Sequence, residues 1–154
     1  MLKIARAICA ATVIAVLQGC ASSGLSAPEI HVALSGSREI PPNASTAAGT
    51  ASFWIHTDRT LNGVVETSGM EGTAANLYLG GAGEIGPLVL ELGRTGSDAP
   101  LAMENAPVSG ASWSIPRSAR FSDEQYRAYL AGQIYLNVHS ARYPEGEIRG
   151  QLRP

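Results

Sequence analysis

Ile134-Tyr135-Leu136-Asn137-Val138-His139 and Glu147-Ile148-Arg149-Gly150-Gln151-Leu152 are the stretches that decide the fold of this chain. In both, apolar and polar residues alternate, which is typical of a strand with one buried face. The seven residues between them contain proline and glycine, which favour a turn. The sequence therefore predicts an antiparallel hairpin at the end of the chain.

Four polar residues share one face of this predicted hairpin. If the loop spans residues 140–146, Asn137 lies opposite Arg149 and His139 lies opposite Glu147. Such cross-strand pairs stabilise a sheet by about 0.2–1 kcal/mol each, which explains these residues structurally. The sharper hypothesis is that the four side chains form a binding patch.

The same alternation recurs upstream, in short segments separated by glycine, proline and polar turn residues. The expected strands span residues 30–35, 48–57, 61–68, 74–79, 87–92 and 110–115, and an irregular stretch spans 94–108. With the hairpin there are about eight short strands. Together with one helix, this composition predicts an all-β fold, an antiparallel β-sandwich or barrel.

One short helix is expected at about residues 122–131. Ser122 and Gln125 have the spacing of a capping box, and a glycine follows the last turn. Three apolar side chains fall on one helical face and are expected to lie on the sheet: Tyr126, Tyr129 and Leu130.

The first twenty residues have a different character. Two basic residues precede an apolar run of eleven residues at 7–17, and a glycine stands directly before Cys20. This order describes an export signal, and the run is shorter than the roughly 20 residues that span a bilayer. Residues 17–20 resemble the lipobox of bacterial lipoproteins, which implies cleavage after residue 19 and a lipid on Cys20. An ordinary signal peptide with a cysteine near its cut is the alternative.

Cleavage after residue 19 would leave 135 of the 154 residues, enough for one domain with its own core. We expect residues 1–19 to be the signal peptide, 20–28 a flexible tether and 29–154 the β domain. Both cysteines lie in the first twenty residues, so the domain has neither a disulfide nor a thiolate metal site. Without Lys3 and Arg6, nine basic residues remain against 13 acidic ones. The arginines are scattered in sequence, so a nucleic-acid partner is not expected.

Several segments resemble the CHRD domain, the module named after chordin. Residues 34–36 (LSG), 39–42 (EIPP) and 48–51 (AGTA) are similar to its opening, and 61–64 (LNGV) and 68–70 (SGM) to its middle. The closing hairpin is similar to its final signature. The resemblance covers about residues 30–152 and implies an extracytoplasmic all-β module with no established enzymatic activity.

One departure from that family concerns metals. Many bacterial members carry an A-H-I-H-x-G run, in which alternate histidines on a strand can grip one metal ion. The aligned residues 75–80 have Asn76 and Tyr78 in place of both histidines. A copper- or zinc-binding, redox-protective domain is therefore the weaker alternative, with no metal ligand and no cofactor assigned. The three histidines share no ligand spacing: His31, His56 and His139.

Motifs for catalysis find little support. No G-x-S-x-G elbow occurs. Residues 81–86 match G-x-G-x-x-G, but a strand-like stretch follows where a dinucleotide loop needs a helix, so a hairpin loop is expected there. A hydrolase is only a residual alternative, because no nucleophile and base can be paired.

The sequence thus predicts a non-catalytic lipoprotein of the bacterial cell envelope, held to the membrane through Cys20. It would act as a binding or structural module, with another envelope protein as its expected partner. Ala21, rather than aspartate, follows the lipidated cysteine. By resemblance to lipoproteins, this implies the outer membrane, facing the periplasm, in a Gram-negative organism.

Overall fold

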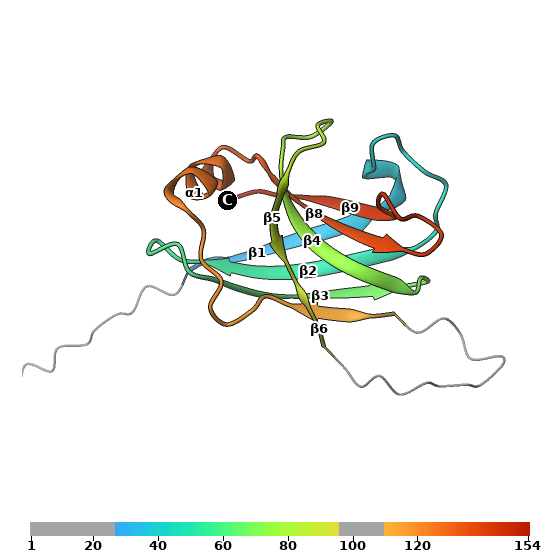
Figure 1. Ribbon diagram of the computed structural model, residues 1–154, viewed down its shortest axis with the longest axis horizontal. Coiled ribbons are helices and arrows are strands. Elements are labelled where there is room, and N and C mark those ends of the chain that lie inside the picture. The colour runs from blue at the N-terminus through green and yellow to red at the C-terminus, as the bar shows by residue number, and fades with distance from the viewer. Residues whose placement is uncertain (1–26, 96–109) are drawn as a thin grey trace, which may run out of the picture.

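The computed structural model describes residues 27–95 and 110–154. These residues form nine antiparallel strands in one sheet that curls into a nearly closed barrel, with one short α-helix and a 3-10 turn (Figure 1). The predicted all-β fold with one short helix is confirmed. The predicted leader, Cys20 and most of the tether lie outside the described residues.

The element bounds agree with most of the expected segments. In chain order the strands are β1 (Glu29–Ser35), β2 (Ala48–Ile55), β3 (Leu61–Ser68), β4 (Gly72–Leu79), β5 (Leu88–Glu91), β6 (Gly93–Thr95), β7 (Ser112–Ser114), β8 (Ile134–Ser140) and β9 (Ile148–Leu152). The 3-10 turn η1 (Gly36–Arg38) follows β1, and helix α1 (Asp123–Leu130) precedes β8. In the part of the chain with described coordinates, no helix is long and apolar enough to cross a membrane.

The barrel interior is the hydrophobic core. Alternation along the strands places every second side chain inside, as β3 shows with its strict buried and exposed pattern. The largest fully buried side chains come from strands all around the barrel. They are Trp113, Phe53, Leu77, Ile134, Leu136, Ile148, Leu152, Val65 and Val138.

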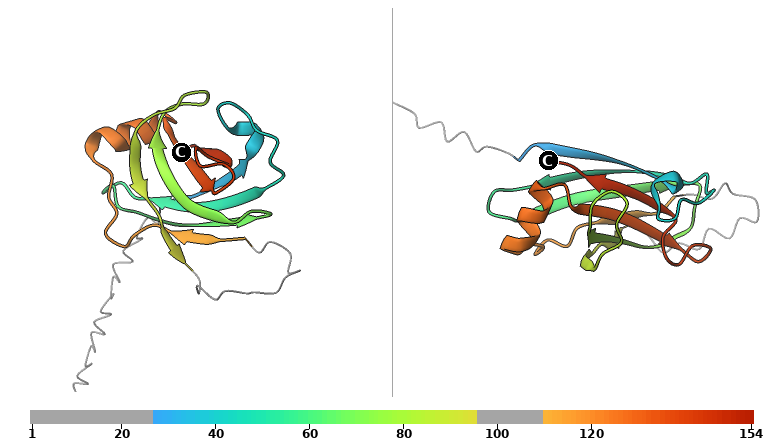
Figure 2. Two further views of the ribbon diagram at one scale, coloured as in Figure 1. Left: turned by 45° about the vertical axis from the view of Figure 1, so that its right-hand side comes forward. Right: turned by 90° about the horizontal axis from the view of Figure 1, so that it is seen from above.

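One short segment closes the barrel. The sheet order is β5-β4-β8-β9-β1-β2-β3-β7-β6, so β5 and β6 are its two edges. Only Leu92 separates these strands in sequence, and its backbone N–H donates to Ala75 O at 3.0 Å. Residues 88–95 therefore run from one edge to the other (Figures 1 and 2). The stretch expected to be irregular, 94–108, lies outside the described residues except for 94 and 95, and for these two the expectation was wrong. The three exposed residues of β6 carry no alternation, and only pairing with β7 makes them a strand.

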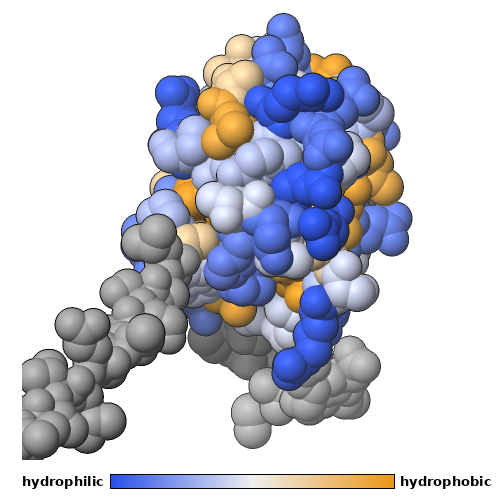
Figure 3. Space-filling model, turned by 90° about the vertical axis from the view of Figure 1, so that its left-hand side faces the viewer, coloured by the Kyte–Doolittle hydropathy of each residue, from blue (hydrophilic) through white to orange (hydrophobic). Residues whose placement is uncertain are grey.

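Helix α1 forms with the predicted cap. Gln125 N donates to Ser122 Oγ at 3.1 Å, and Ser122 N donates to Gln125 Oε1 at 2.8 Å. Tyr129 is buried, but Leu130 is 53% exposed, so the prediction that it lies on the sheet was wrong. The helix has eight residues, and its buried face is centred on Ala128 and Tyr129 instead. The surface at this end of the molecule is mostly hydrophilic, with scattered hydrophobic spots (Figure 3).

The join between β1 and β9 is the shortest ladder of the barrel. It contains one registered pair, Ser35 with Arg149, whereas β1 and β2 share seven. The strands approach closely because Gly150 has no side chain: a Cβ there would lie 2.5 Å from Val32 Cγ1. We call this join the β1–β9 seam.

Candidate functional site

The outer face of β8 is covered rather than open to solvent. Ile134, Leu136 and Val138 point into the core, as predicted, and Tyr135, Asn137 and His139 alternate with them on the outside. Residues from the η1–β2 and β4–β5 connections lie over this face and leave a cavity of about 160 Å³, which we call the β8 cavity. It is lined by Glu39, Ile40, Tyr78, Ile85, Gly86, Tyr135, Asn137, His139, Glu145 and Arg149.

Three of the four residues of the predicted patch line this cavity. Asn137 is paired with Arg149 across the hairpin, as the sequence predicted. Glu147 does not line it: its Oε1 accepts a hydrogen bond of 2.6 Å from Ser45 Oγ. Because β9 begins only at the next residue, the expected cross-strand pair between His139 and Glu147 is replaced by contacts to other partners.

The most unusual feature of the cavity is an incompletely hydrogen-bonded pair. Asn137 Nδ2 donates to Glu39 Oε2 at 3.3 Å, while Glu39 Oε1 and Asn137 Oδ1 are buried without a partner. The two residues are 6% and 5% exposed. Burial raises the pKa of Glu39 from 4.5 to about 7, although Arg149 and the Asn137 hydrogen bond pull it down.

Arg149 forms one wall of the cavity and is 3% exposed. Its Nη2 donates to Gly81 O at 3.0 Å and to Glu84 O at 2.8 Å, which holds the β4–β5 loop over the sheet. The guanidinium carbon lies 3.4 Å from the centre of the Tyr135 ring, a stacked cation–π contact. Burial lowers the pKa of Arg149, because the charged group has left water.

A second polar chain runs along the rim. His139 donates from Nδ1 to Pro144 O at 2.9 Å, since a carbonyl can only accept. Its Nε2 shares a hydrogen bond of 3.1 Å with the Tyr78 hydroxyl, and Asn76 Nδ2 donates to the same hydroxyl at 3.1 Å. Tyr78 also stacks on Tyr135, with ring centres 5.3 Å apart. These contacts hold both ring nitrogens of His139 in place.

Sequence reasoning missed two residues of the site. Tyr135 could have been found, because it alternates with Asn137 and His139 on the same strand face. Glu39 could not, since it precedes two prolines in a connection and meets Asn137 only through the tertiary fold. The expected hairpin loop at 81–86 is confirmed, because it connects the antiparallel strands β4 and β5.

The histidines do not assemble a metal centre. His31 is exposed on β1 beside Ser52, and His56 lies near Asn62. Across residues 27–95 and 110–154, no three histidine, cysteine, aspartate or glutamate side chains gather in a way that could hold a metal ion.

The barrel and the site together define a class of protein: an all-β module with a polar cavity on the outer face of its sheet, covered by two connecting segments. Within that class the family can be named. The CHRD domain model matches residues 30–152, and the chain belongs to the CHRD domain family. No curated protein and no solved structure gave a match.

Proposed function

We propose that this protein is a lipid-anchored, non-catalytic protein of the bacterial cell envelope whose CHRD domain binds a small polar ligand in the β8 cavity. The observation that carries the binding role is the Glu39–Asn137 pair, with one unpartnered buried oxygen on each side chain. A buried acceptor without a donor costs about 1–3 kcal/mol. A ligand that brings N–H or O–H donors would recover that energy.

The cavity also favours a particular shape of ligand. Tyr78 and Tyr135 stack against each other along its wall, and the cavity holds about 160 Å³. A molecule with a few heavy atoms and at least two donors fits this space. Its donors would face Glu39 Oε1 and Asn137 Oδ1.

Nuclear magnetic resonance tests the binding role directly. Titration of the full chain in neutral detergent with acetamide or methylammonium is expected to shift the side-chain amide signals of Asn137 saturably. The exposed amide of Asn62 on β3 serves as an internal control. The variant Glu39→Gln should weaken the shift. No saturable change at Asn137 would overturn the proposed binding role.

The anchor is supported by the order of charge, apolar run and small residue that ends at Cys20. Cells grown with a clickable palmitate analogue should label the wild-type chain and the variant Cys9→Ser, and leave Cys20→Ser unlabelled. Cys9→Ser is the matched control, because it removes the other cysteine from within the leader. Equal labelling of all three chains, or of none, would contradict the anchor. Membrane fractionation then tests whether Ala21 accompanies outer-membrane sorting.

A further inference from the structure

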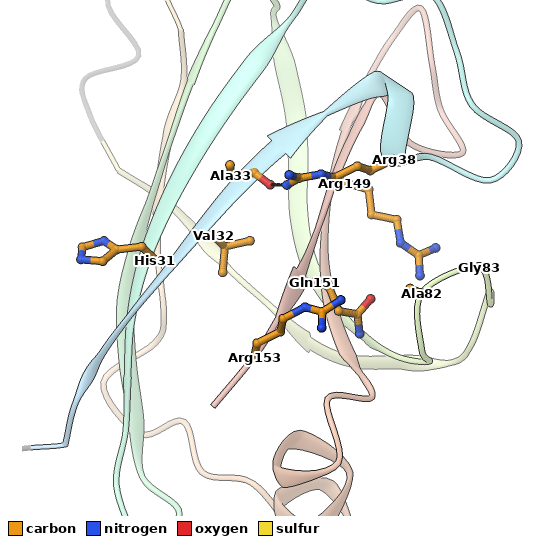
Figure 4. Close-up of a pocket in the computed structure, with 9 residues that line it drawn as sticks. All are labelled: His31, Val32, Ala33, Arg38, Ala82, Gly83, Arg149, Gln151 and Arg153. Atoms are coloured by element: carbon orange, nitrogen blue, oxygen red, sulfur yellow. Dashed lines mark hydrogen bonds between the residues drawn. The ribbon is translucent and has the colours of Figure 1, made fainter.

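A second and larger hollow lies outside the β8 cavity, along the β1–β9 seam. It has a volume of about 510 Å³ and is lined by His31, Val32, Ala33, Arg38, Ala82, Gly83, Arg149, Gln151 and Arg153 (Figure 4). We call it the arginine groove, because three of its nine lining residues are arginines and none is acidic.

Strand alternation explains why the arginines gather here. Arg149, Gln151 and Arg153 are alternate residues at the end of the chain, so they share the outer face of β9 and its extension. Arg38 comes from η1, directly after β1, and reaches back along β1 to donate to Ala33 O beside the seam. On the other side of the groove, the β4–β5 loop contributes the small residues Ala82 and Gly83, which leave the space open.

The side chains that line the groove point in different directions (Figure 4). Arg149 points toward the loop with Ala82 and Gly83, whereas Arg153 lies beside Gln151. His31 points away from the arginines. The Nε2 of Gln151 is occupied, because it lies within 2.8–2.9 Å of three backbone carbonyls. The exposed guanidinium groups of Arg38 and Arg153 are therefore the cations that a ligand can reach, and the buried Arg149 lies behind them.

The charge of the groove opposes that of the whole chain, whose net charge is −2. Arg38 and Arg149 donate to backbone carbonyls, which accept hydrogen bonds without neutralising the cations. The carboxylate of Glu84 accepts from Gly81 N at 2.9 Å on the flanking loop and does not line the groove. Glu39 lies on the cavity side of Arg149. Arg38 and Arg153 have no acidic neighbour among the lining residues, so an anion in the groove would meet two cations, with the charge of the buried Arg149 behind them.

We propose that the arginine groove binds a ligand of the phosphate class, a compact anion with at least two charged oxygens. A planar guanidinium matches the paired oxygens of a phosphate group, and the two exposed groups, Arg38 and Arg153, favour more than one negative charge. The volume of about 510 Å³ leaves room for a substituent beyond the phosphate itself. The phosphate could belong to a free molecule or to the headgroup of a phospholipid. This proposal depends neither on the anchor nor on a ligand in the β8 cavity.

Calorimetric titration of the full chain in neutral detergent with pyrophosphate tests the site. The double variant R38Q/R153Q removes two groove arginines that do not line the β8 cavity. It is expected to weaken binding about tenfold or more, since two charge-assisted contacts are lost. The double variant R117Q/R127Q is the matched control, because it removes the same charge from exposed positions outside the groove. That control should change the dissociation constant by less than about twofold.

Vesicles separate the two sources of phosphate. Because a lipid anchor would carry the chain onto any vesicle, the excess of flotation with phosphatidylglycerol over phosphatidylcholine vesicles reports recognition of an anionic headgroup. Pyrophosphate binding that is lost only in R38Q/R153Q, without such an excess, assigns the groove to a free phosphate. An excess that is lost in the same variant, without pyrophosphate binding, assigns it to a headgroup. If neither probe binds, or if both double variants lose binding equally, the proposal is overturned. Circular dichroism melting confirms that each variant is folded.

Discussion

Asn137 and Glu39, 98 residues apart in sequence, are joined by one hydrogen bond of 3.3 Å, and each side chain keeps one buried oxygen without a partner. While Glu39 is ionised, neither of these oxygens can satisfy the other, because both can only accept hydrogen bonds. A protonated carboxyl has an O–H that could be donated to Asn137 Oδ1. The raised pKa of Glu39, about 7, agrees with this arrangement. Protonation of Glu39 would thus bring a hydrogen-bond donor to the pair, whereas the ionised carboxylate brings none.

The free energy of unfolding should therefore fall as the pH rises toward the pKa of Glu39 in the folded state, about 7. Between pH 4.5 and about 7 the folded state holds this proton and the unfolded state has lost it, so the free energy of unfolding decreases through that window. The stabilising contribution of the Glu39 proton is fully present below pH 4.5 and is lost above about pH 7. Its size is on the order of 1–2 kcal/mol after allowance for solvent screening of a partly buried carboxyl. Urea unfolding across this range measures it.

The variant Glu39→Gln isolates this titration from all others. Glutamine keeps the shape and can donate an N–H to Asn137 Oδ1 at every pH. We expect it to match the wild type near pH 4.5 and to exceed it at pH 8. Glu66→Gln, an exposed position on β3, is the control. If the free energies of unfolding of the wild type and Glu39→Gln differ by the same amount at pH 5 and pH 8, the titration of Glu39 is not the cause.

Gly146 is required by the site and not only by the turn. Its φ is +138°, and a Cβ there would lie 2.4 Å from Asn137 Nδ2. Gly132 has a φ of +68° but nothing within 4 Å of the same position. Alanine at Gly132 should cost about 1 kcal/mol from backbone strain alone. Alanine at Gly146 should cost roughly 1–3 kcal/mol more, since it must also displace the Asn137 amide.

Urea unfolding of the two alanine variants makes the comparison, and the Asn137 amide signals report the displacement. Equal losses of stability at Gly146 and Gly132 would show that only the turn conformation matters there. The Asn137 signals should move in Gly146→Ala and remain in place in Gly132→Ala.

Local pattern was enough to predict most strands and the helix. Alternation in β3 and the capping box of α1 are encoded within a few residues, so the sequence predicts them directly. Strand β6 was missed because its three exposed residues become a strand only through pairing with β7. Barrel closure depends on the same non-local pairing and could not be predicted from periodicity.

The site was predicted in part for the same reason. The register that pairs Asn137 with Arg149 follows from the hairpin itself. Glu147 is absent from the β8 cavity because its side chain accepts a hydrogen bond from Ser45, which is 102 residues away in sequence. No local pattern predicts that contact. Arg149 and Arg153 lie four residues apart on one strand face, but only the approach of β1 to β9 brings Arg38 to them.

Arg149 should be irreplaceable by lysine. Lysine keeps the charge but loses the planar stack on Tyr135 and the two hydrogen bonds to the β4–β5 loop. We expect Arg149→Lys to cost on the order of 2–4 kcal/mol. Hydrogen exchange at residues 81–86 should also become faster.

Arg94 provides the matched control for Arg149. It also donates to a backbone carbonyl, Gly72 O at 2.9 Å, and lies over an aromatic ring, but it is exposed. Arg94→Lys should cost less than about 1 kcal/mol and leave exchange in the β4–β5 loop unchanged. Similar losses in both variants would mean that burial of Arg149 is not what makes it irreplaceable.

The positions of Asn76 and Tyr78 on β4 can be tested for their capacity to hold a metal ion. Asn76 and Tyr78 lie on the same face of β4, and the Tyr78 hydroxyl is 3.1 Å from His139 Nε2. The double variant Asn76→His/Tyr78→His would set two alternate imidazoles beside the existing one, a ligand set suited to copper or zinc. We expect it to bind Zn²⁺ in calorimetry at least about 100-fold more tightly than the wild type.

Removal of the third ligand completes this test. With His139→Ala added, the engineered affinity should fall back by about tenfold or more, because two histidines on one strand leave the coordination shell open. A double variant that binds Zn²⁺ no better than the wild type would show that the face of β4 is too crowded to admit a metal. Retention of full affinity without His139 would show that the two new histidines recruit some other ligand.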